Sequence, residues 1–95
     1  MKSATTANIA LPQVLDITAA GPLTSDLLRL RGKDLVVDAS GVERMGAQCV
    51  QVLLSASATW VHDGMELELA DPSPAFIEGL AAMGLEVANF SARNI

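Results

Sequence analysis

The stretch LVVDASGVERMGAQCVQVLL, residues 35–54, decides how this chain folds. Its first three residues form an apolar run between Asp34 and Asp38, a pattern typical of a short strand buried on both faces of a sheet. Residues 38–46 predict a loop, and apolar residues then recur at helical spacing, which predicts a helix over 47–61. The predicted buried side of this helix contains Val50, Leu53, Leu54 and Ala58.

The segment before this stretch predicts two short strands and a helix. Residues 1–7 are mostly polar and predict a flexible lead-in, after which residues 9–11 predict a strand and residues 14–17 a second extended piece. A helix is expected from Thr18, a suitable N-cap, to Gly32, a suitable C-cap. Its predicted apolar side consists of Ala20, Leu23, Leu27 and Leu30.

The segment after this stretch predicts a strand, a helix and a last strand. Residues 66–70 alternate polar and apolar side chains, as a half-exposed strand does. The Pro-containing turn 71–74 leads to a helix that Gly84 ends. Residues 85–87 predict the last strand, and residues 92–95 predict a frayed end. The predicted buried side of this third helix consists of Phe76, Ile77, Leu80 and Met83.

Strands that alternate with helices predict an α/β fold. We expect one mixed or mostly parallel sheet of four to five strands with helices packed on it. A length of 95 residues fits one domain. Because 51% of the residues are hydrophobic but only 3% are aromatic, the core is expected to be aliphatic, with little surface for stacking on bases or sugars.

Charge and composition disfavour several classes of partner and location. A net charge of -5 with only six Lys and Arg disfavours nucleic-acid binding and anionic membranes. No apolar run approaches the roughly 20 residues of a membrane span, and the N-terminus lacks the apolar region of a signal peptide. The single cysteine, Cys49, cannot form an intramolecular disulfide. We therefore expect a cytoplasmic protein that is not inserted into a membrane.

The candidate chemical groups form no recognisable catalytic or metal-binding pattern. They are His62, Cys49, Asp16, Asp38 and Asp71. His62 fits a solvated helix end, and Cys49 fits a small buried side chain with no second cysteine beside it. The glycines form no phosphate-binding loop, and one histidine with one cysteine matches no zinc spacing. We expect no catalytic residue, no metal and no cofactor.

The central stretch resembles the signature of STAS domains, the family of anti-sigma-factor antagonists. In that family a strand ending in Asp-Leu-Ser-x-Val leads through Asp-Ser-Ser-Gly or Asp-Thr-Gly-Gly to a Leu-x-x-Leu-Leu helix, and residues 35–54 align with it without a gap. Residues 15–17 resemble the family's Leu-Asp-Leu, and residues 67–80 resemble its later strand and helix. The resemblance implies a STAS (SpoIIAA-like) fold over residues 8–95 and a non-catalytic protein-interaction module of bacterial signal transduction.

The sequence departs from the family where the regulated members are phosphorylated. At the position of Asp-Ser-Ser-Gly, whose second serine is the phosphoacceptor, the chain carries Gly46, Ala47, Gln48 and Cys49. Gln48, which matches the phosphoacceptor, has no hydroxyl group, and Ser40 matches the family's structural serine. The two charges and three oxygens of a phosphoserine therefore cannot be placed there.

The resemblance implies a docking face made of the loop before the central helix and the first turns of that helix. An exposed helix N-terminus offers free backbone N–H groups, and Met45 is an adaptable apolar contact. Met45 and Val50 could instead pack inside, and Trp60 could anchor an interface or cover one end of the core. The implied partner-binding residues are Glu43, Arg44, Met45, Gly46, Ala47, Gln48, Val50 and Gln51.

Short strings carry a narrower resemblance, to the small CheS-like STAS proteins of alphaproteobacterial chemotaxis operons. They lie at residues 30–32, 38–40, 49–53 and 59–60. This resemblance implies a CheA-type histidine kinase as the partner and an influence on its phosphorelay. The alternatives are an anti-sigma kinase, or the ATPase of an ABC lipid transporter. A small enzyme or nucleotide-binding protein is a third class, which the missing motifs disfavour.

The absence of hydroxyl groups at Ala47 and Gln48 generates a first prediction. Incubation with STAS-specific serine kinases and ATP should leave the chain unmodified, because neither side chain can accept a phosphoryl group. Intact-mass and peptide mass spectrometry check this, with a phosphorylatable STAS protein as the positive control. Stoichiometric phosphate on any residue of 46–49 would contradict it.

Overall fold

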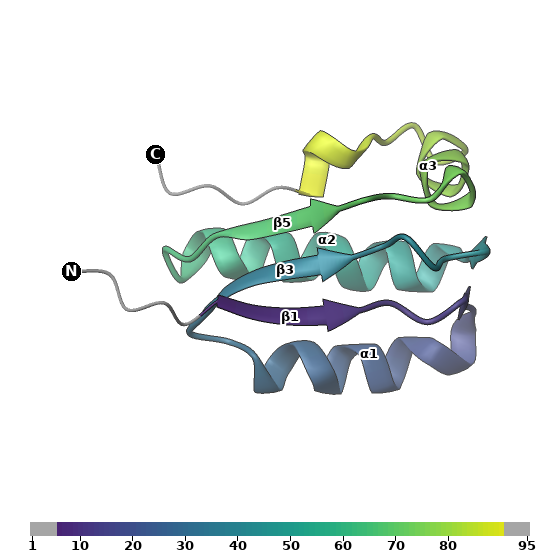
Figure 1. Ribbon diagram of the computed structural model, residues 1–95. Helices are drawn as coiled ribbons and strands as arrows, with labels where there is room; N and C mark the ends of the chain where they lie inside the picture. Colours follow the sequence, from purple (N-terminus) through teal and green to yellow (C-terminus); the bar gives the residue numbers. More distant parts are fainter. Residues whose placement is uncertain (1–5, 91–95) are drawn as a thin grey trace.

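Three parallel strands run side by side through the centre of the molecule (Figure 1). They are β1 (Thr6–Ala10), β3 (Asp34–Asp38) and β5 (Leu67–Ala70), in the order β1-β3-β5. The computed structural model describes residues 6–90. Because β3 lies in the middle and pairs in parallel with both neighbours, all three strands end at the same edge of the sheet.

The remaining two strands form a separate parallel ribbon. β2 (Val14–Leu15) pairs with β4 (Arg44–Met45), and neither belongs to the three-stranded sheet. The expected single sheet of four to five strands is thus divided, and every strand pair among residues 6–90 is parallel. The loop predicted over 38–46 contains β4, which is too short for alternation of side chains to reveal it.

The first strand begins earlier than predicted. It covers Thr6–Ala10 rather than residues 9–11, so the predicted lead-in over 1–7 is wrong for its last two residues. The backbones of Thr6 and Ala7 pair with the start of β3. Strand pairing uses backbone groups, so a polar side chain does not prevent it. Leu11 follows the strand and is buried. The predictions for residues 1–5 and 92–95 concern residues outside the described ones.

The described helices are α1 (Ile17–Arg29), α2 (Ala47–His62), α3 (Pro74–Ala81) and the short 3-10 helix η1 (Val87–Phe90). α1 and α2 pack against each other along the sheet, whereas α3 lies beyond the carboxyl ends of the strands, next to β4, and η1 lies beside β5 (Figure 1). In Figure 1, α2 lies behind the sheet and α1 lies beneath β1, while no described helix lies in front of the strands. The α/β class predicted from the sequence is therefore confirmed.

No helix within residues 6–90 covers the second face of the sheet, contrary to the prediction that β3 is buried on both faces. Leu35 and Val37 are buried, but Val36 between them is only half-buried. Its register partners Asn8 on β1 and Glu68 on β5 are both exposed. A continuous apolar run predicted burial on both faces, yet the alternating exposure of the neighbouring strands decides that only one face is covered.

The start of α1 differs from the prediction by two residues. Asp16, not Thr18, is the N-cap, and its carboxylate accepts hydrogen bonds from the backbone N–H groups of Thr18 at 3.0 Å and Ala19 at 3.2 Å. The C-cap is Leu30, and Gly32 with φ of 88° turns the chain after it. Aspartate and threonine both suit an N-cap, but here the Asp16 carboxylate accepts these bonds.

The central helix is the best predicted element. It was expected over 47–61 and covers Ala47–His62. Gly64, with φ of 71°, ends it as predicted. The backbone N–H of Gly64 donates to Val61 at 3.1 Å, and that of Met65 donates to Trp60 at 2.9 Å, so the last carbonyl groups are satisfied by a Schellman motif.

The predicted buried sides of α2 and α3 are only partly right. Ala58 of α2 is exposed, and Ile77 and Met83 in and after α3 are 48% and 39% exposed. The spacing of apolar residues predicts that one side of each helix is buried. It does not predict the exact rotation of the helix, so residues at the border of that side can be exposed. The residues of α2 that are buried are Cys49, Val50, Leu53, Ala56, Ser57 and Trp60.

Trp60 covers one end of the core. It is 1% exposed, and its indole Nε1–H donates to the backbone carbonyl of Lys33 at 2.7 Å. A buried tryptophan with a satisfied N–H group is a structural residue. Of the two interpretations left open for Trp60, the core position is therefore confirmed.

The last strand, predicted at 85–87, is wrong. The backbone N–H of Leu85 donates to Leu80 in α3 at 2.9 Å, so the chain turns back on that helix. The side chain of Asn89 then accepts from the backbone N–H of Glu86 at 2.8 Å. Such a local side-chain bond competes with a strand ladder, which explains the turn into η1.

The core position of Leu53 generates a second prediction. Its side chain is 2% exposed, so Leu53→Ala should lower the free energy of unfolding by about 2–5 kcal/mol through lost burial and a residual cavity. Urea denaturation measures this. Val61→Ala is the control on the same helix, because Val61 is 59% exposed and its truncation should change stability by about 0.5 kcal/mol or less. Equal losses for the two variants would contradict the assignment of the buried face.

Candidate docking surface

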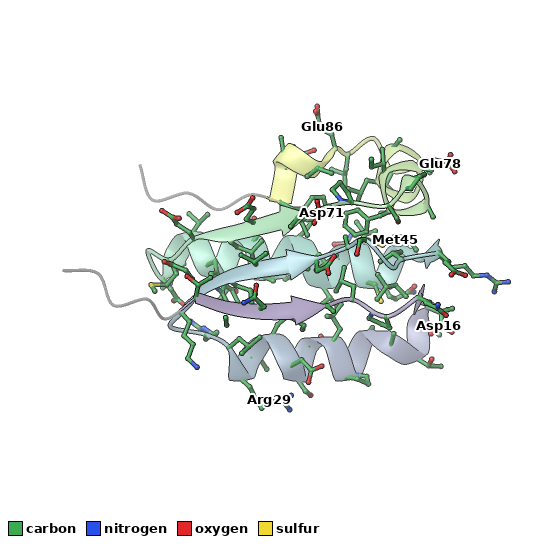
Figure 2. All side chains as sticks on the ribbon, viewed as in Figure 1. Asp16, Arg29, Met45, Asp71, Glu78 and Glu86 are labelled. Carbon is green, nitrogen blue, oxygen red and sulfur yellow. The ribbon has the colours of Figure 1, made fainter. Side chains whose placement is uncertain are left out.

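The implied partner-binding residues lie at the carboxyl end of the sheet. α1 and α2 both begin there, next to the β2–β4 ribbon, and Figure 2 shows Asp16 and Met45 at this end. The two helix starts touch, since Cys49 Sγ lies 3.4 Å from the backbone oxygen of Asp16. In α/β proteins this end of a parallel sheet is where partners and ligands are usually bound.

A buried serine holds the loop that follows β3. Ser73 Oγ donates to the carbonyl of Val42 at 2.6 Å and accepts from the backbone N–H of Phe76 at 3.0 Å. The backbone N–H of Ser73 also donates to the carbonyl of Ala39, at 3.2 Å. Ser73 is the N-cap of α3, so one residue both starts that helix and fixes the loop.

Sequence reasoning missed this role of Ser73. The signal was present, because a serine directly before Pro74 is a typical N-cap followed by proline at the first helical position. The partner carbonyl on Val42 was not predictable, since it lies 31 residues earlier in the chain. The hydrogen bond from Ser73 to Val42 could therefore not be predicted from the sequence.

The loop between β1 and β2 also holds β4 in place. The carbonyl of Gln13 accepts hydrogen bonds from the backbone N–H groups of Glu43 at 2.7 Å and Arg44 at 3.0 Å. The backbone N–H of Gly46 donates to Leu15 at 2.8 Å. A Cβ atom added at Gly46 would lie 3.1 Å from the Leu15 carbonyl oxygen, so the close approach favours glycine.

Met45 packs against Gly79 of α3, where a residue with a side chain would not fit. A Cβ atom added at Gly79 would lie 2.7 Å from Met45 Cβ and 2.9 Å from its Cγ. Met45 is half-buried, so its side chain contributes both to packing and to the surface. Neither of the two interpretations left open for Met45 excludes the other.

The start of α2 is exposed and has no side-chain cap. Gly46 is the N-cap and offers no acceptor, and the first turn contains no acidic residue. The first backbone N–H groups of a helix lack intrahelical partners, and the helix dipole makes this end partly positive. Ala47 and Gln48 are exposed in this turn. The surface can therefore accept an oxygen-rich or amide-bearing contact.

Most of the implied residues form one surface, and we call Glu43, Arg44, Met45, Gly46, Ala47 and Gln48 the docking surface. Val50 is a correction: it is 0% exposed and packs in the core, because it lies on the same side of α2 as Leu53. Gln51 is exposed but lies one turn further along α2, in a groove next to α1.

Sequence reasoning did not include the start of α1 in this surface. Ile17 is 68% exposed there and follows the capping residue Asp16. Hydrogen bonds from the Thr18 hydroxyl and from backbone N–H groups hold the pKa of Asp16 below its usual value. Residues 15–17 carry a family-like string, and in the structure Leu15 and Asp16 lie beside Gly46.

The candidate chemical groups do not converge. Burial raises the pKa of the Cys49 thiol, which disfavours the nucleophilic thiolate form. His62 lies at the other end of α2, exposed beside Asp63. Asp38 accepts a hydrogen bond from Ser40, which lowers its pKa, and Asp71 is exposed. Among residues 6–90 no group of three or more His, Cys, Asp or Glu could hold a metal ion.

The comparison with protein families identifies this arrangement. A family model described as "Mlab, STAS domain" matches residues 2–90. The chain belongs to the STAS domain family. STAS domains generally interact with other proteins, and the match extends from before β1 to the end of η1. No curated protein and no solved structure gives a significant match.

Gln48, which the sequence resemblance places at the phosphoacceptor position, is the second residue of α2 and is exposed. The family match establishes the STAS domain and not the CheS-like subgroup. In residues 6–90 no helix is both long and apolar enough to cross a membrane.

The contact between Met45 and Gly79 generates a third prediction. Gly79→Ala should destabilise the protein by about 1–3 kcal/mol, because the new methyl group overlaps Met45 Cβ and β4 must move away from α3. Met45→Gly removes both overlapping atoms, so the double variant should lose less stability than the two single losses together. A coupling of about 0.5–3 kcal/mol in urea denaturation is expected. Strictly additive losses would contradict the contact.

Proposed function

We propose that this STAS domain is a non-catalytic adaptor that binds one protein partner through the docking surface and has no phosphoserine switch. The observation that carries the proposal is the exposed, uncapped start of α2, which bears Gln48 where regulated STAS proteins bear serine. An amide at this position keeps hydrogen-bonding capacity without a charge that a kinase or phosphatase could add or remove.

The fixed geometry of the docking surface supports this proposal. Ser73 holds Ala39 and Val42, and Gln13 and Leu15 hold the backbone from 43 to 46. A contact surface that is already ordered loses little conformational entropy when a partner binds. Binding affinity can then come from small contacts rather than from a large buried area.

The charges on the docking surface favour a partner with charges of both signs. Glu43 and Arg44 are adjacent and exposed, and no hydrogen bond or ion pair is seen for either side chain among the described residues. Each is available to pair across an interface, where complementary charges fix orientation and accelerate encounter. A uniformly basic or acidic partner surface would leave one of them unpaired.

Three classes of partner are candidates. The CheA-type histidine kinase is favoured by the short strings at residues 30–32, 38–40, 49–53 and 59–60, and binding would modulate its phosphorelay in bacterial signal transduction. The alternatives are an anti-sigma kinase and the ATPase of an ABC lipid transporter. The matched family description names Mlab and not a chemotaxis protein, so these alternatives are tested beside the kinase on equal terms.

The absence of catalysis is part of the proposal. The thiol of Cys49 is buried, and the exposed His62 lies at the far end of α2 from the docking surface. A titration with ATP and GTP, followed by the fluorescence of the single tryptophan, should show no saturable change. Saturable nucleotide binding would favour the enzyme or nucleotide-binding class instead.

The docking surface generates a fourth prediction. Gln48→Lys should weaken partner binding by about thirtyfold or more, because it places an unpaired positive charge against the positive end of α2 in a desolvated contact. Isothermal calorimetry against each of the three partner classes measures this. Thermal melts of the free variant should show only a small change, since Gln48 is exposed.

A matched control separates the docking surface from the rest of α2. Ala58→Lys adds the same charge at an exposed position of the same helix, well away from its start, and should leave the affinity unchanged. If Gln48→Lys keeps native melting and binds as tightly as the parent, docking takes place elsewhere. Met45→Asp is less clean as a test, because Met45 also packs against Gly79.

A further inference from the structure

The strand β1 forms one edge of the three-stranded sheet, and within residues 6–90 it has a strand partner on one side only, which is β3. The backbone N–H of Leu11 donates to Asp38 at 2.9 Å, and this phase of the parallel ladder turns the odd-numbered residues of β1 toward β3. The backbone N–H and C=O groups of Thr6, Asn8 and Ala10 therefore point outward along the edge.

The other edge of the sheet is protected against pairing, whereas the β1 edge is not. η1 lies beside β5, and β5 carries the exposed Glu68 and is followed by Pro72. Charges, proline, bulges and covering segments are the means by which proteins block a free strand edge. The sequence of β1, Thr-Ala-Asn-Ile-Ala, has no charge and no proline, and its register with β3 is unbroken. This edge therefore keeps its capacity to pair with another strand.

The core is not fully closed at the β1 edge. Leu35 and Val37 of β3 lie on the covered face of the sheet and are buried. Their register partners on β1, Ala7 and Ile9, lie on the same face and pack against the core, yet both are only half-buried. A further strand beside β1 would remove more apolar area of these two side chains from water, which stabilises the pairing.

β1 is complementary to a second β1 in antiparallel orientation. When Asn8 lies opposite the second copy's Asn8, Thr6 lies opposite Ala10, and each such pair exchanges two backbone hydrogen bonds. The same register places the large Ile9 opposite the small Ala7 on the covered face, so the two half-buried side chains cover each other. A shift by two residues loses one hydrogen-bonded pair and places two alanines or two isoleucines opposite each other.

The residues outside the described range are too few to supply this strand. Residues 91–95 follow η1 beside β5, and crossing three strands at about 4.8 Å per strand uses most of the roughly 18 Å that five extended residues span. A two-residue turn within residues 1–5 would leave only about three residues, enough for the start of β1 alone. The register centred on Asn8 uses the whole of β1 and needs a second chain.

We propose that two copies of this chain pair through antiparallel β1 strands, centred on Asn8, into one continuous sheet. α1 lies beneath β1, and its Asp26 and Arg29 pair with each other, so α1 adds no unpaired charge at this edge (Figure 1). The docking surface lies at the carboxyl end of the sheet, and this inference does not depend on the proposed partner.

The fifth prediction compares two substitutions at one position. Sedimentation equilibrium of the parent should show a weak, reversible monomer–dimer equilibrium, because the contact between two short strands is small. Asn8→Pro should raise the dimer dissociation constant about tenfold or more, because it removes the central N–H of each copy and leaves the facing carbonyls unpaired. Asn8→Ala keeps that N–H and should dimerise within about threefold of the parent.

The stability of the Asn8→Pro variant is measured by circular dichroism melts at low protein concentration. The variant should remain folded, because the N–H of Asn8 points away from β3 and proline is tolerated at such edge positions. Equal dissociation constants for the proline and alanine variants, both folded, would show that the backbone of β1 takes no part in association, and the proposal is then overturned.

Hydrogen exchange followed by NMR is a second measurement, and it needs no substitution. The amides of Asn8 and Ala10 should exchange more slowly as the protein concentration rises, because they are bonded only in the dimer. The amide of Ile9 faces β3 and should be protected at every concentration. Concentration-independent exchange at Asn8 and Ala10 in a dimerising protein would place the interface elsewhere.

A monomeric parent would also overturn the proposal. Absence of dimer up to about 1 mM protein excludes a useful self-association. If Asn8→Pro then weakens binding of one of the three partner classes in calorimetry, while Asn8→Ala does not, the β1 edge pairs with a strand of that partner and not with a second copy.

Discussion

The hydroxyl group of Ser73 joins the two parts of the molecule on which the docking surface depends. It bonds the carbonyl of Val42 in the loop after β3 and the backbone N–H of Phe76 in α3, and both bonds are buried. Breaking either would leave a polar group without a partner in an apolar core, which costs more than the bond itself contributes. No buried side-chain polar atom among residues 6–90 lacks a partner. These buried hydrogen bonds therefore favour the observed conformation of the loop.

A second constraint acts from the sheet. With parallel strands and helices on one side, the carboxyl ends of the strands and the starts of α1 and α2 are brought to one edge. Gly46 then lies close to the Leu15 backbone, and Gly79 lies close to the Met45 side chain, so β2, β4 and α3 are packed together. The docking surface is thus made from segments far apart in the chain, and close packing at two glycines sets its shape.

The sequence predicts the parts of this structure that local interactions determine. The bounds of α2, its end at Gly64 and the family-like stretch around β3 follow from helical spacing, glycine and a short apolar run. The prediction fails where tertiary contacts decide. The two-residue strand β4 exists only through its partner β2, and Asn89 converts an apparent strand into η1. Likewise, six of the implied site residues gather on one surface, but Val50 faces the core, because the exact rotation of a helix depends on what it packs against.

The glycine at the N-cap of α2 has a consequence for engineering more stable variants. Serine or aspartate at an N-cap is among the first substitutions that a designer would try. At position 46 an added Cβ atom would lie 3.1 Å from the Leu15 carbonyl oxygen, so a side chain there requires that oxygen to move by a few tenths of an ångström. Acidic residues further along the first turn avoid this contact, but they lie directly on the surface that partners meet. Substitutions in the first turn of α2 that change stability will therefore also change partner binding.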